Sequence, residues 1–180
     1  MILTKSFVQN VDGLVLNVSK AVVARGEVIR LSVASLLAGG HLLLNDLPGS
    51  GKTLLARSLA LSLGASFKRI QFNPDLLPTD ITGSSVFNRI ENRFDFVEGP
   101  IFANVVLADE INRTSTRTQS ALLEAMAEGQ VTTDGKSYSL PDPFWLVATQ
   151  NDVDAFGTFP LPHAQLDRFT MSLKIGSPNV

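Results

Sequence analysis

Residues 46–54 read Asp-Leu-Pro-Gly-Ser-Gly-Lys-Thr-Leu, a sequence that can hold a phosphate group. Its two glycines let backbone N–H groups approach an anion with no side chain between. We expect Lys52 to reach the β- and γ-phosphates of a nucleoside triphosphate and the Thr53 hydroxyl to ligate Mg²⁺. Asp46 replaces the first glycine of the pattern G-x-x-x-x-G-K-[ST]. The residues assigned to ATP binding, together with Asp109, are Asp46, Pro48, Gly49, Ser50, Gly51, Lys52, Thr53 and Leu54.

Two adjacent carboxylates, Asp109 and Glu110, follow the apolar run at 105–108. A buried strand beside a phosphate loop places its last residues at the carboxyl edge of the sheet, where ligands bind. Asp109 can hold Mg²⁺ through water, and Glu110 can orient and deprotonate an attacking water. The pair could instead cap the next helix, but the phosphate loop upstream favours the catalytic interpretation.

Other polar residues could assist at the same edge. Asn151 follows an apolar run, and its amide could bond the attacking water or the γ-phosphate, although a plain turn residue is an open alternative. Arg168 could act as an arginine finger on the γ-phosphate of a neighbouring subunit. A surface ion pair is the common alternative for an arginine, and Arg113 and Arg117 are rivals for the finger role.

A sheet is needed to bring these residues together, and the apolar pattern predicts one. Short apolar runs predict strands at 42–45, 67–71, 105–108, 144–148 and 169–174. Helical spacing predicts helices at 3–23, with a break near Asp12 and Gly13, and at 27–38, 52–63, 116–128 and 161–168. Apolar strands separated by helices imply an α/β fold, a doubly wound and mostly parallel sheet with helices on both faces.

Two β-hairpins are predicted as insertions in this core. The first covers 85–97 and turns near 88–93; the second covers 130–140 and turns at Asp134 and Gly135. The segment between the second strand and the first hairpin, with Pro74, Pro78 and Gly83, is expected to be a loop.

Composition narrows the classes of function. A chain of 180 residues suits one domain, and its 44% hydrophobic content indicates a globular fold. The formal net charge of −2 gives no reason to expect direct binding to nucleic acid or to an anionic membrane. Cysteine is absent, and neither a signal peptide nor a membrane span is expected, so a cytoplasmic location is the default. His41, His163 and Trp145 are interpreted as structural.

The assembled segments closely resemble the MoxR family of AAA+ ATPases. The resemblance rests on Leu107-Ala-Asp-Glu-Ile-Asn-Arg and on longer stretches, and it covers nearly all of the chain from Gly39 onward. The remaining stretches are 39–44, 69–83, 99–104, 118–126, 148–151 and 164–169.

This resemblance implies a P-loop NTPase fold with five core strands and a role for each matching residue. Lys52 and Thr53 would belong to Walker A, and Asp109 and Glu110 to Walker B. Asn151 would be sensor 1 and Arg168 the arginine finger, while the two hairpins would face the pore of a ring. Asp46 in place of the first glycine is usual in this family.

The resemblance also implies partners and a domain plan. Members work with ATP and Mg²⁺ as rings, so a hexamer of this chain is expected. They remodel or mature client protein complexes in a chaperone-like way, often with a von Willebrand factor A domain protein. Residues 1–38 would supply N-terminal helices and 39–180 the P-loop core, with no helical lid before the end at Val180. The glycine usual near the adenine is shifted to Gly26.

Two alternatives remain. The chain could be a nucleotide-binding scaffold with little turnover, although the intact Glu110 argues against that. A GTPase switch would use Asp80-Ile-Thr-Gly and Thr149-Gln-Asn-Asp, but Asp80 lies in a proline-rich segment and Gln150 replaces the lysine of the guanine motif.

Overall fold

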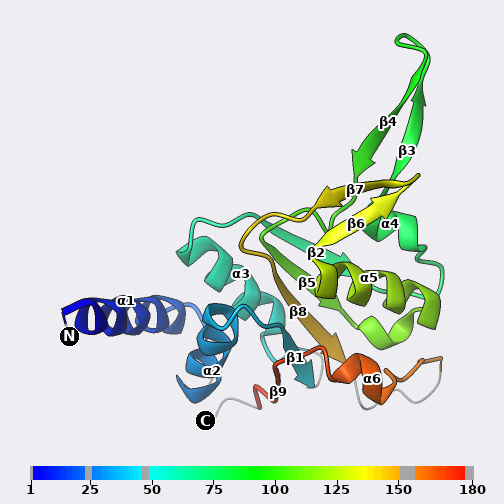
Figure 1. The fold of residues 1–180 in the computed structure, drawn as a ribbon. Helices are drawn as coiled ribbons and strands as arrows, with labels where there is room; N and C mark the ends of the chain where they lie inside the picture. The colour runs from blue at the N-terminus through cyan, green and yellow to red at the C-terminus, as the bar shows by residue number, and fades with distance from the viewer. Residues whose placement is uncertain (1, 23–25, 46–48, 151–156, 177–180) are drawn as a thin grey trace.

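The computed structural model of the chain describes residues 2–22, 26–45, 49–150 and 157–176. Its centre is a sheet of five parallel strands in the order β2-β5-β8-β1-β9 (Figure 1). The strands are β1 Leu42–Asn45, β2 Phe67–Gln71, β5 Val105–Asp109, β8 Trp145–Gln150 and β9 Met171–Leu173. The predicted α/β fold, with its five-stranded sheet, is therefore confirmed.

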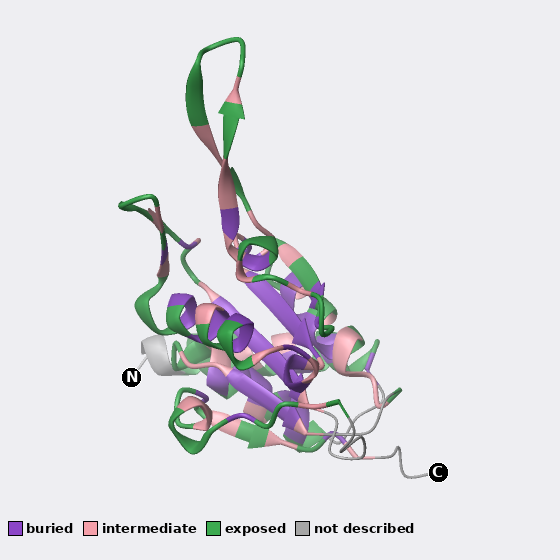
Figure 2. Ribbon diagram, turned by 90° about the vertical axis from the view of Figure 1, so that its right-hand side faces the viewer, coloured by how far each residue is buried: buried purple, intermediate pink, exposed green. Residues whose placement is uncertain are grey.

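Side chains that alternate along each strand enter two separate cores. Leu42 and Leu44 of β1 pack in the core beneath α1, α2 and α3, whereas Leu43 packs in the core beneath α4 and α5. Trp145 is buried in the first core, which confirms its structural interpretation. Figure 2 shows the buried sheet between these helical layers. The helices are α1 Ile2–Ser19, α2 Gly26–Leu37, α3 Lys52–Ser62, α4 Pro78–Thr82, η1 Ile111–Arg113, α5 Thr116–Glu128 and α6 His163–Leu166.

Two sequence predictions about helices are wrong. Helix α1 runs through Asp12 and Gly13 without a break, because Val15 and Val18 beyond them are buried against the core. That burial outweighs the cost of about 1 kcal/mol for a glycine in a helix. The segment expected to be a loop holds α4, which is short and buries Ile81.

Both predicted hairpins are confirmed. Strands β3 (Gly83–Asn88) and β4 (Arg93–Glu98) form a long arm that projects from the sheet, and β6 (Gln130–Thr133) and β7 (Lys136–Ser139) form a shorter one (Figure 1). The second turns at Asp134 and Gly135, both with positive φ, as a two-residue hairpin loop requires.

Glycines 83 and 99 let the long arm leave the core. A Cβ on Gly99 would lie 2.2 Å from the Ile81 carbonyl oxygen and 2.4 Å from the Gly83 nitrogen. A Cβ on Gly83 would lie 2.2 Å from the Val97 carbonyl oxygen. Because these neighbours are backbone atoms, a larger side chain cannot be accommodated by a change of rotamer.

His41 lies just before β1, at the edge of the sheet where the strands begin, and links β1 to β8 and to the residue before β9. Its Nδ1 accepts a hydrogen bond from the Leu146 N–H at 3.0 Å, and its carbonyl oxygen accepts one from the Thr170 N–H at 2.9 Å. Burial lowers the pKa of His41 to about 4, against a smaller opposing effect of a hydrogen bond to the Met126 backbone. The imidazole is thus neutral near pH 7, and the structural interpretation of His41 holds.

We predict that Gly99→Ala destabilises the chain by roughly 2 kcal/mol or more, because the new methyl group overlaps backbone atoms. The free energy of unfolding in urea measures this. Gly13→Ala is the matched control: a Cβ there meets no described atom within 4 Å, so the control should be more stable by about 0.5–1 kcal/mol. A Gly99→Ala variant as stable as wild type would show that the arm is not packed as described.

We predict that His41 makes stability fall in acid. Its folded-state pKa of about 4 lies below the unfolded value of 6.5, so the unfolded state binds more protons between these values. The contribution is fully present above pH 6.5 and declines as the pH falls towards 4, by on the order of 3 kcal/mol in all.

Urea unfolding between pH 4 and pH 7 tests this contribution. His41→Gln should show a shallower decline in unfolding free energy than wild type. His163→Gln, at the exposed second histidine, should keep the wild-type decline. Equal declines in all three proteins would contradict the role given to His41.

Candidate functional site

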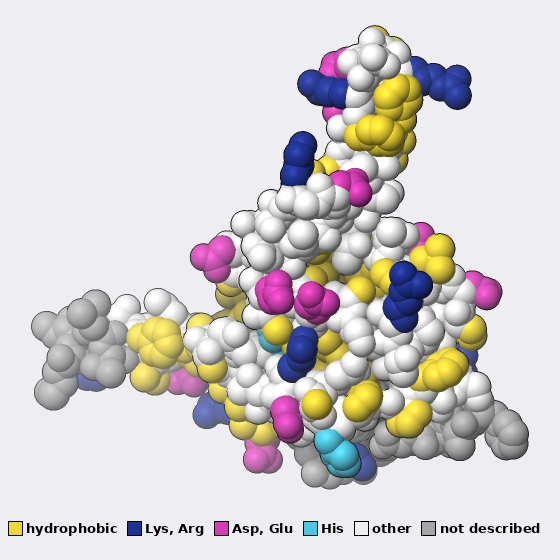
Figure 3. All heavy atoms as spheres, turned by 45° about the vertical axis from the view of Figure 1, so that its right-hand side comes forward, with side chains coloured by type: hydrophobic (Ala, Val, Ile, Leu, Met, Phe, Trp, Pro, Cys, Tyr) yellow, Lys and Arg dark blue, Asp and Glu magenta, His cyan; other side chains and the backbone are white. Residues whose placement is uncertain are grey.

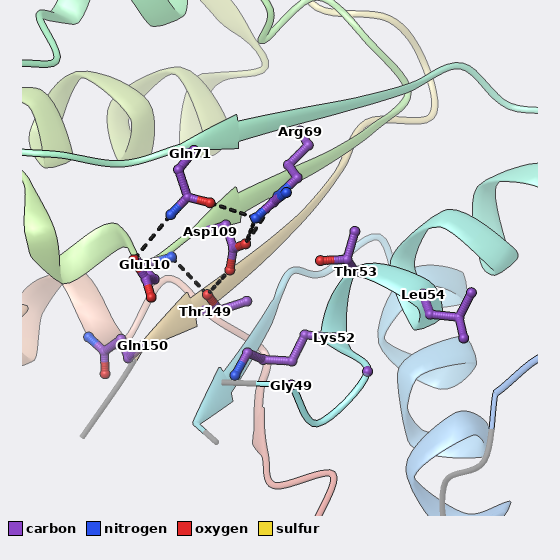
Figure 4. A pocket seen from close by; sticks show the side chains of 11 residues that line it. Gly49, Lys52, Thr53, Leu54, Arg69, Gln71, Asp109, Glu110, Thr149 and Gln150 are labelled. Atoms are coloured by element: carbon purple, nitrogen blue, oxygen red, sulfur yellow. Dashed lines mark hydrogen bonds and ion pairs between the residues drawn. The ribbon is translucent and has the colours of Figure 1, made fainter. Parts of the chain in front are cut away.

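A cavity of about 380 Å³ lies at the carboxyl edge of the sheet, between the start of α3 and the ends of β2, β5 and β8 (Figure 4). It brings together most of the residues expected to act. Arg168 does not line it, and Asp46, Pro48 and Asn151 lie outside the described residues. The lining residues are Gly49, Gly51, Lys52, Thr53, Leu54, Arg69, Gln71, Asp109, Glu110, Thr149 and Gln150.

The loop before α3 has the geometry of an anion cradle. Gly49 and Gly51 have φ of 83° and 91°, in the left-handed region that favours glycine, and a Cβ on either would meet no described atom within 4 Å. Gly51 caps α3 and offers no side chain to the first-turn N–H groups, so these remain available to an anion. Ser50 Oγ is buried and has no hydrogen-bond partner among the described residues. These features fit a bound phosphate.

The buried end of β5 is held by a hydroxyl from β8. Asp109 Oδ1 accepts a hydrogen bond from Thr149 Oγ1 at 2.7 Å, and the Glu110 N–H donates to the same hydroxyl oxygen at 2.8 Å. The hydroxyl therefore uses its donor on one acidic residue and an acceptor on the next. Parallel pairing of β5 with β8 places Thr149 within reach of both.

A cation from β2 occupies the other oxygen of Asp109. Arg69 Nη2 and Nε lie 2.6 Å and 3.1 Å from Asp109 Oδ2. Both side chains belong to adjacent parallel strands, in which Gln71 is the register partner of Asp109. The carboxylate that sequence analysis assigned to Mg²⁺ is thus paired with an arginine that sequence analysis missed.

Gln71 connects this ion pair to the second acid. Its Oε1 accepts from Arg69 Nη2 at 2.6 Å, and its Nε2 donates to Glu110 Oε2 at 3.1 Å (Figure 4). Arg113 Nε lies 3.4 Å from the same Glu110 oxygen. Glu110 itself has φ of 58° and ψ of 50°, a left-handed conformation that costs a non-glycine residue about 1 kcal/mol or more. The contacts of Glu110 with the surrounding residues must offset that cost.

The donor set constrains the metal chemistry. Thr53 and Asp109 face the same cavity, but the described residues contain no cluster of three or more His, Cys, Asp or Glu side chains that could hold a metal ion. Mg²⁺ commonly binds one or two protein oxygens and completes its shell with water and phosphate oxygens. The residues present therefore fit Mg²⁺ that is delivered with a nucleotide.

The arginine candidates lie in different places. Arg168 Nη1 donates to the Leu123 carbonyl oxygen of α5, and Arg168 is exposed. Arg113 instead contacts the Glu110 carboxylate of its own chain. An arginine finger must reach a neighbouring subunit, so the assignment of Arg168 to that role stays a prediction.

Four lining residues were missed from the sequence: Arg69, Gln71, Thr149 and Gln150. One signal for the first two was available. Alternation along the predicted strand at 67–71 puts Arg69 and Gln71 on one face, next to its carboxyl end. A polar pair there, in a strand that follows a phosphate-loop helix, indicates a ligand-facing position.

Comparison with known proteins places the chain in an ATPase family. Residues 41–171 match the model of the ATPase family associated with various cellular activities (AAA). A crystal structure of a candidate ATPase from Cytophaga hutchinsonii superposes with a TM-score of 0.83 at 40% identity, over 99% of this chain and 56% of that one.

Some of the curated relatives carry the MoxR name. The chain is 41% identical to Chaperone MoxR1 of Mycobacterium tuberculosis, over 96% of this chain and 46% of that protein. It is 56% identical to the uncharacterized protein YeaC of Bacillus subtilis, over 91% of this chain and 51% of that protein. The chain thus spans about half the length of these relatives.

We predict that Thr149→Val destabilises the chain by roughly 2–4 kcal/mol, because the isosteric change leaves Asp109 Oδ1 and the Glu110 N–H without their shared partner. Urea unfolding measures this. Thr149→Ser keeps the hydroxyl and loses one methyl group, so it should cost only about 1 kcal/mol. If the valine variant were as stable as the serine variant, the hydroxyl would have no bridging role.

Proposed function

Because this chain belongs to the MoxR family of AAA ATPases, we propose that it binds ATP with Mg²⁺ in the cavity described above and hydrolyses it to ADP and phosphate. One observation carries the proposal. Lys52 and Thr53, at the start of α3, line the same cavity as Asp109 and Glu110 at the end of β5. A phosphate cradle thus faces an acidic pair across a space that suits a polyphosphate.

Each residue has a task in this proposal. The Gly49–Gly51 backbone and Lys52 bind the phosphates, and Thr53 and Asp109 hold Mg²⁺. When bound, Mg²⁺ would neutralise negative charge on the phosphates. Glu110 orients the attacking water and takes its proton. The water oxygen bonds to the γ-phosphorus as the bond to the bridging oxygen breaks, and that oxygen leaves on ADP.

The other residues that we assign to the site are assigned from their positions in the chain and relative to the cavity. Asn151 directly follows Gln150, which lines the cavity, so we keep Asn151 as the contact for the γ-phosphate or the water. Asp46 and Pro48 stay with the phosphate loop that they precede. Arg168 lies away from the cavity and is exposed, as an arginine must be to act on the neighbouring subunit of a ring.

A GTPase switch is disfavoured by the place of Asp80. Its carboxylate accepts a hydrogen bond from the Leu77 N–H at 2.9 Å and caps α4, so Asp80 lies in a helix and does not follow a strand. A switch aspartate would need to reach the metal in the cavity, and Asp80 does not line that cavity.

We further propose a chaperone-like role, exerted by a hexameric ring on a client protein complex. The long hairpin supports it because the arm exposes apolar side chains to solvent: Ile90 is 95% exposed and Phe94 is 68% exposed. Figure 3 shows hydrophobic side chains gathered on this arm between basic ones. Exposed apolar groups of this kind mark protein-binding surfaces. The name Chaperone MoxR1 of a relative points the same way.

The proposal also covers the domain plan of the chain, its partner and its location. Helix α1 packs on α2 and α3, and we treat the N-terminal helices of 1–38 with the P-loop core of 39–180 as one ATPase core. A partner with a von Willebrand factor A domain and a cytoplasmic location are proposed, and direct nucleic-acid binding is not. In the described part of the chain, none of the helices has the length and apolar content needed to cross a bilayer.

We predict that Glu110→Gln lowers ATP hydrolysis by roughly a hundredfold or more while ATP still binds, since the amide cannot accept the proton from water. Phosphate release measures turnover, and a fluorescent ATP analogue measures binding. Glu124→Gln, on the exposed side of α5, is the control and should keep wild-type turnover. Equal turnover in wild type and Glu110→Gln would remove Glu110 from catalysis, and binding without turnover in wild type would favour the scaffold.

A further inference from the structure

The guanidinium of Arg69 contacts Asp109, the carboxylate assigned to Mg²⁺. Two of its nitrogens, Nη2 and Nε, converge on the single oxygen Oδ2 at 2.6 Å and 3.1 Å. We propose that Arg69 is a built-in cation for Asp109, and that Mg²⁺ binding displaces it from the carboxylate. This inference rests on the proposed ATPase function and concerns the metal requirement of the same site.

The lone pairs of Asp109 explain why the two cations compete. A carboxylate offers about four lone-pair positions. Thr149 Oγ1 uses one on Oδ1, and Arg69 uses both on Oδ2, so one position is left on Oδ1, close to a guanidinium that repels a second cation. Mg²⁺, or a water bound to it, must use a lone pair that points into the cavity. Arg69 and Asp109 both line that cavity, so a metal ion that enters it comes close to the guanidinium.

Burial explains why Asp109 needs a cation when no metal is present. The Asp109 side chain is only 12% exposed, and a buried carboxylate without a partner is strongly unfavourable. Arg69 supplies the compensating charge and keeps the carboxylate aimed at the cavity. The acid is therefore in place before the metal arrives.

Exposure explains how the arginine can leave. The Arg69 side chain is 47% exposed and belongs to β2 at one edge of the sheet. Solvent screens the exposed side of this ion pair, which weakens the contact that Mg²⁺ must replace. Mg²⁺ carries twice the charge, so it can replace the guanidinium. The displaced side chain remains at a cavity that takes phosphates, where a guanidinium is also favourable.

Replacement of Arg69 should therefore have opposite effects on two measurable affinities. Without the guanidinium, Mg²⁺ no longer competes for Asp109, so less Mg²⁺ is needed. The cavity also loses one positive charge, so nucleotide without metal binds more weakly. A residue that only stabilised the fold would weaken both kinds of binding.

Binding of mant-ADP, followed by fluorescence over a series of Mg²⁺ concentrations and in EDTA, tests the inference. For Arg69→Met we expect the half-saturating Mg²⁺ concentration to fall about two- to fivefold, which is the release of an ion pair of this exposure. We expect weaker binding in EDTA. Lys68→Met removes a neighbouring cation that does not line the cavity, so it should match wild type in both measurements.

Arg69→Lys keeps the charge but cannot place two fixed donors on one oxygen. The Mg²⁺ requirement of Arg69→Lys should lie between those of wild type and Arg69→Met. If circular dichroism shows that Arg69→Met is unfolded, the comparison of Arg69→Lys with wild type is the test. An unchanged or higher Mg²⁺ requirement in these variants, with wild-type binding intact, overturns the inference. A wild-type chain that binds no mant-ADP at any Mg²⁺ concentration overturns the proposed function itself.

Discussion

The rest of the site depends on the buried carboxylate at the end of β5. Asp109 ends a strand whose residues are all buried, so its charge needs partners from the strands on either side. Strand β8 supplies the Thr149 hydroxyl and β2 supplies the Arg69 guanidinium. The sheet order β2-β5-β8 is what places both within reach. The same constraint therefore links the topology to the chemistry.

The two edges of the sheet differ because parallel strands all end on one side. Polar side chains gather at the carboxyl edge, where the cavity lies. At the opposite edge lies His41, which burial keeps neutral and which accepts a hydrogen bond from the backbone of β8. Aromatic contacts join the two hairpin arms to each other and to the segment before β5. Phe96 of the long arm stacks on Tyr138 of the short arm with ring centroids 3.9 Å apart, and also meets Phe102 ahead of β5 edge-on.

Local sequence patterns predicted most of the helices and strands. They did not predict contacts between residues that are far apart in the sequence. Helix α5 matches its predicted bounds because Ser115 caps its start and Gly129 ends it in the left-handed conformation. Helix α4 was missed because five residues carry no periodic signal, and its cap and its buried Ile81 depend on the surrounding fold. In the site, Lys52 and Glu110 were found because each lies in a continuous motif. Arg69 and Thr149 were not, because their partners lie on other strands.

The arrangement around Glu110 indicates how the proposed base is prepared for its task. Its left-handed backbone turns the chain out of β5, and the hydrogen bond from its N–H to the Thr149 hydroxyl holds that turn. Its described side-chain contacts, with Gln71 and Arg113, both use Oε2. Oε1 is then the oxygen that would accept a proton from water. Because Gln71 also binds Arg69, the base and the metal-binding acid share one polar network, so a change at either carboxylate alters the contacts of the other.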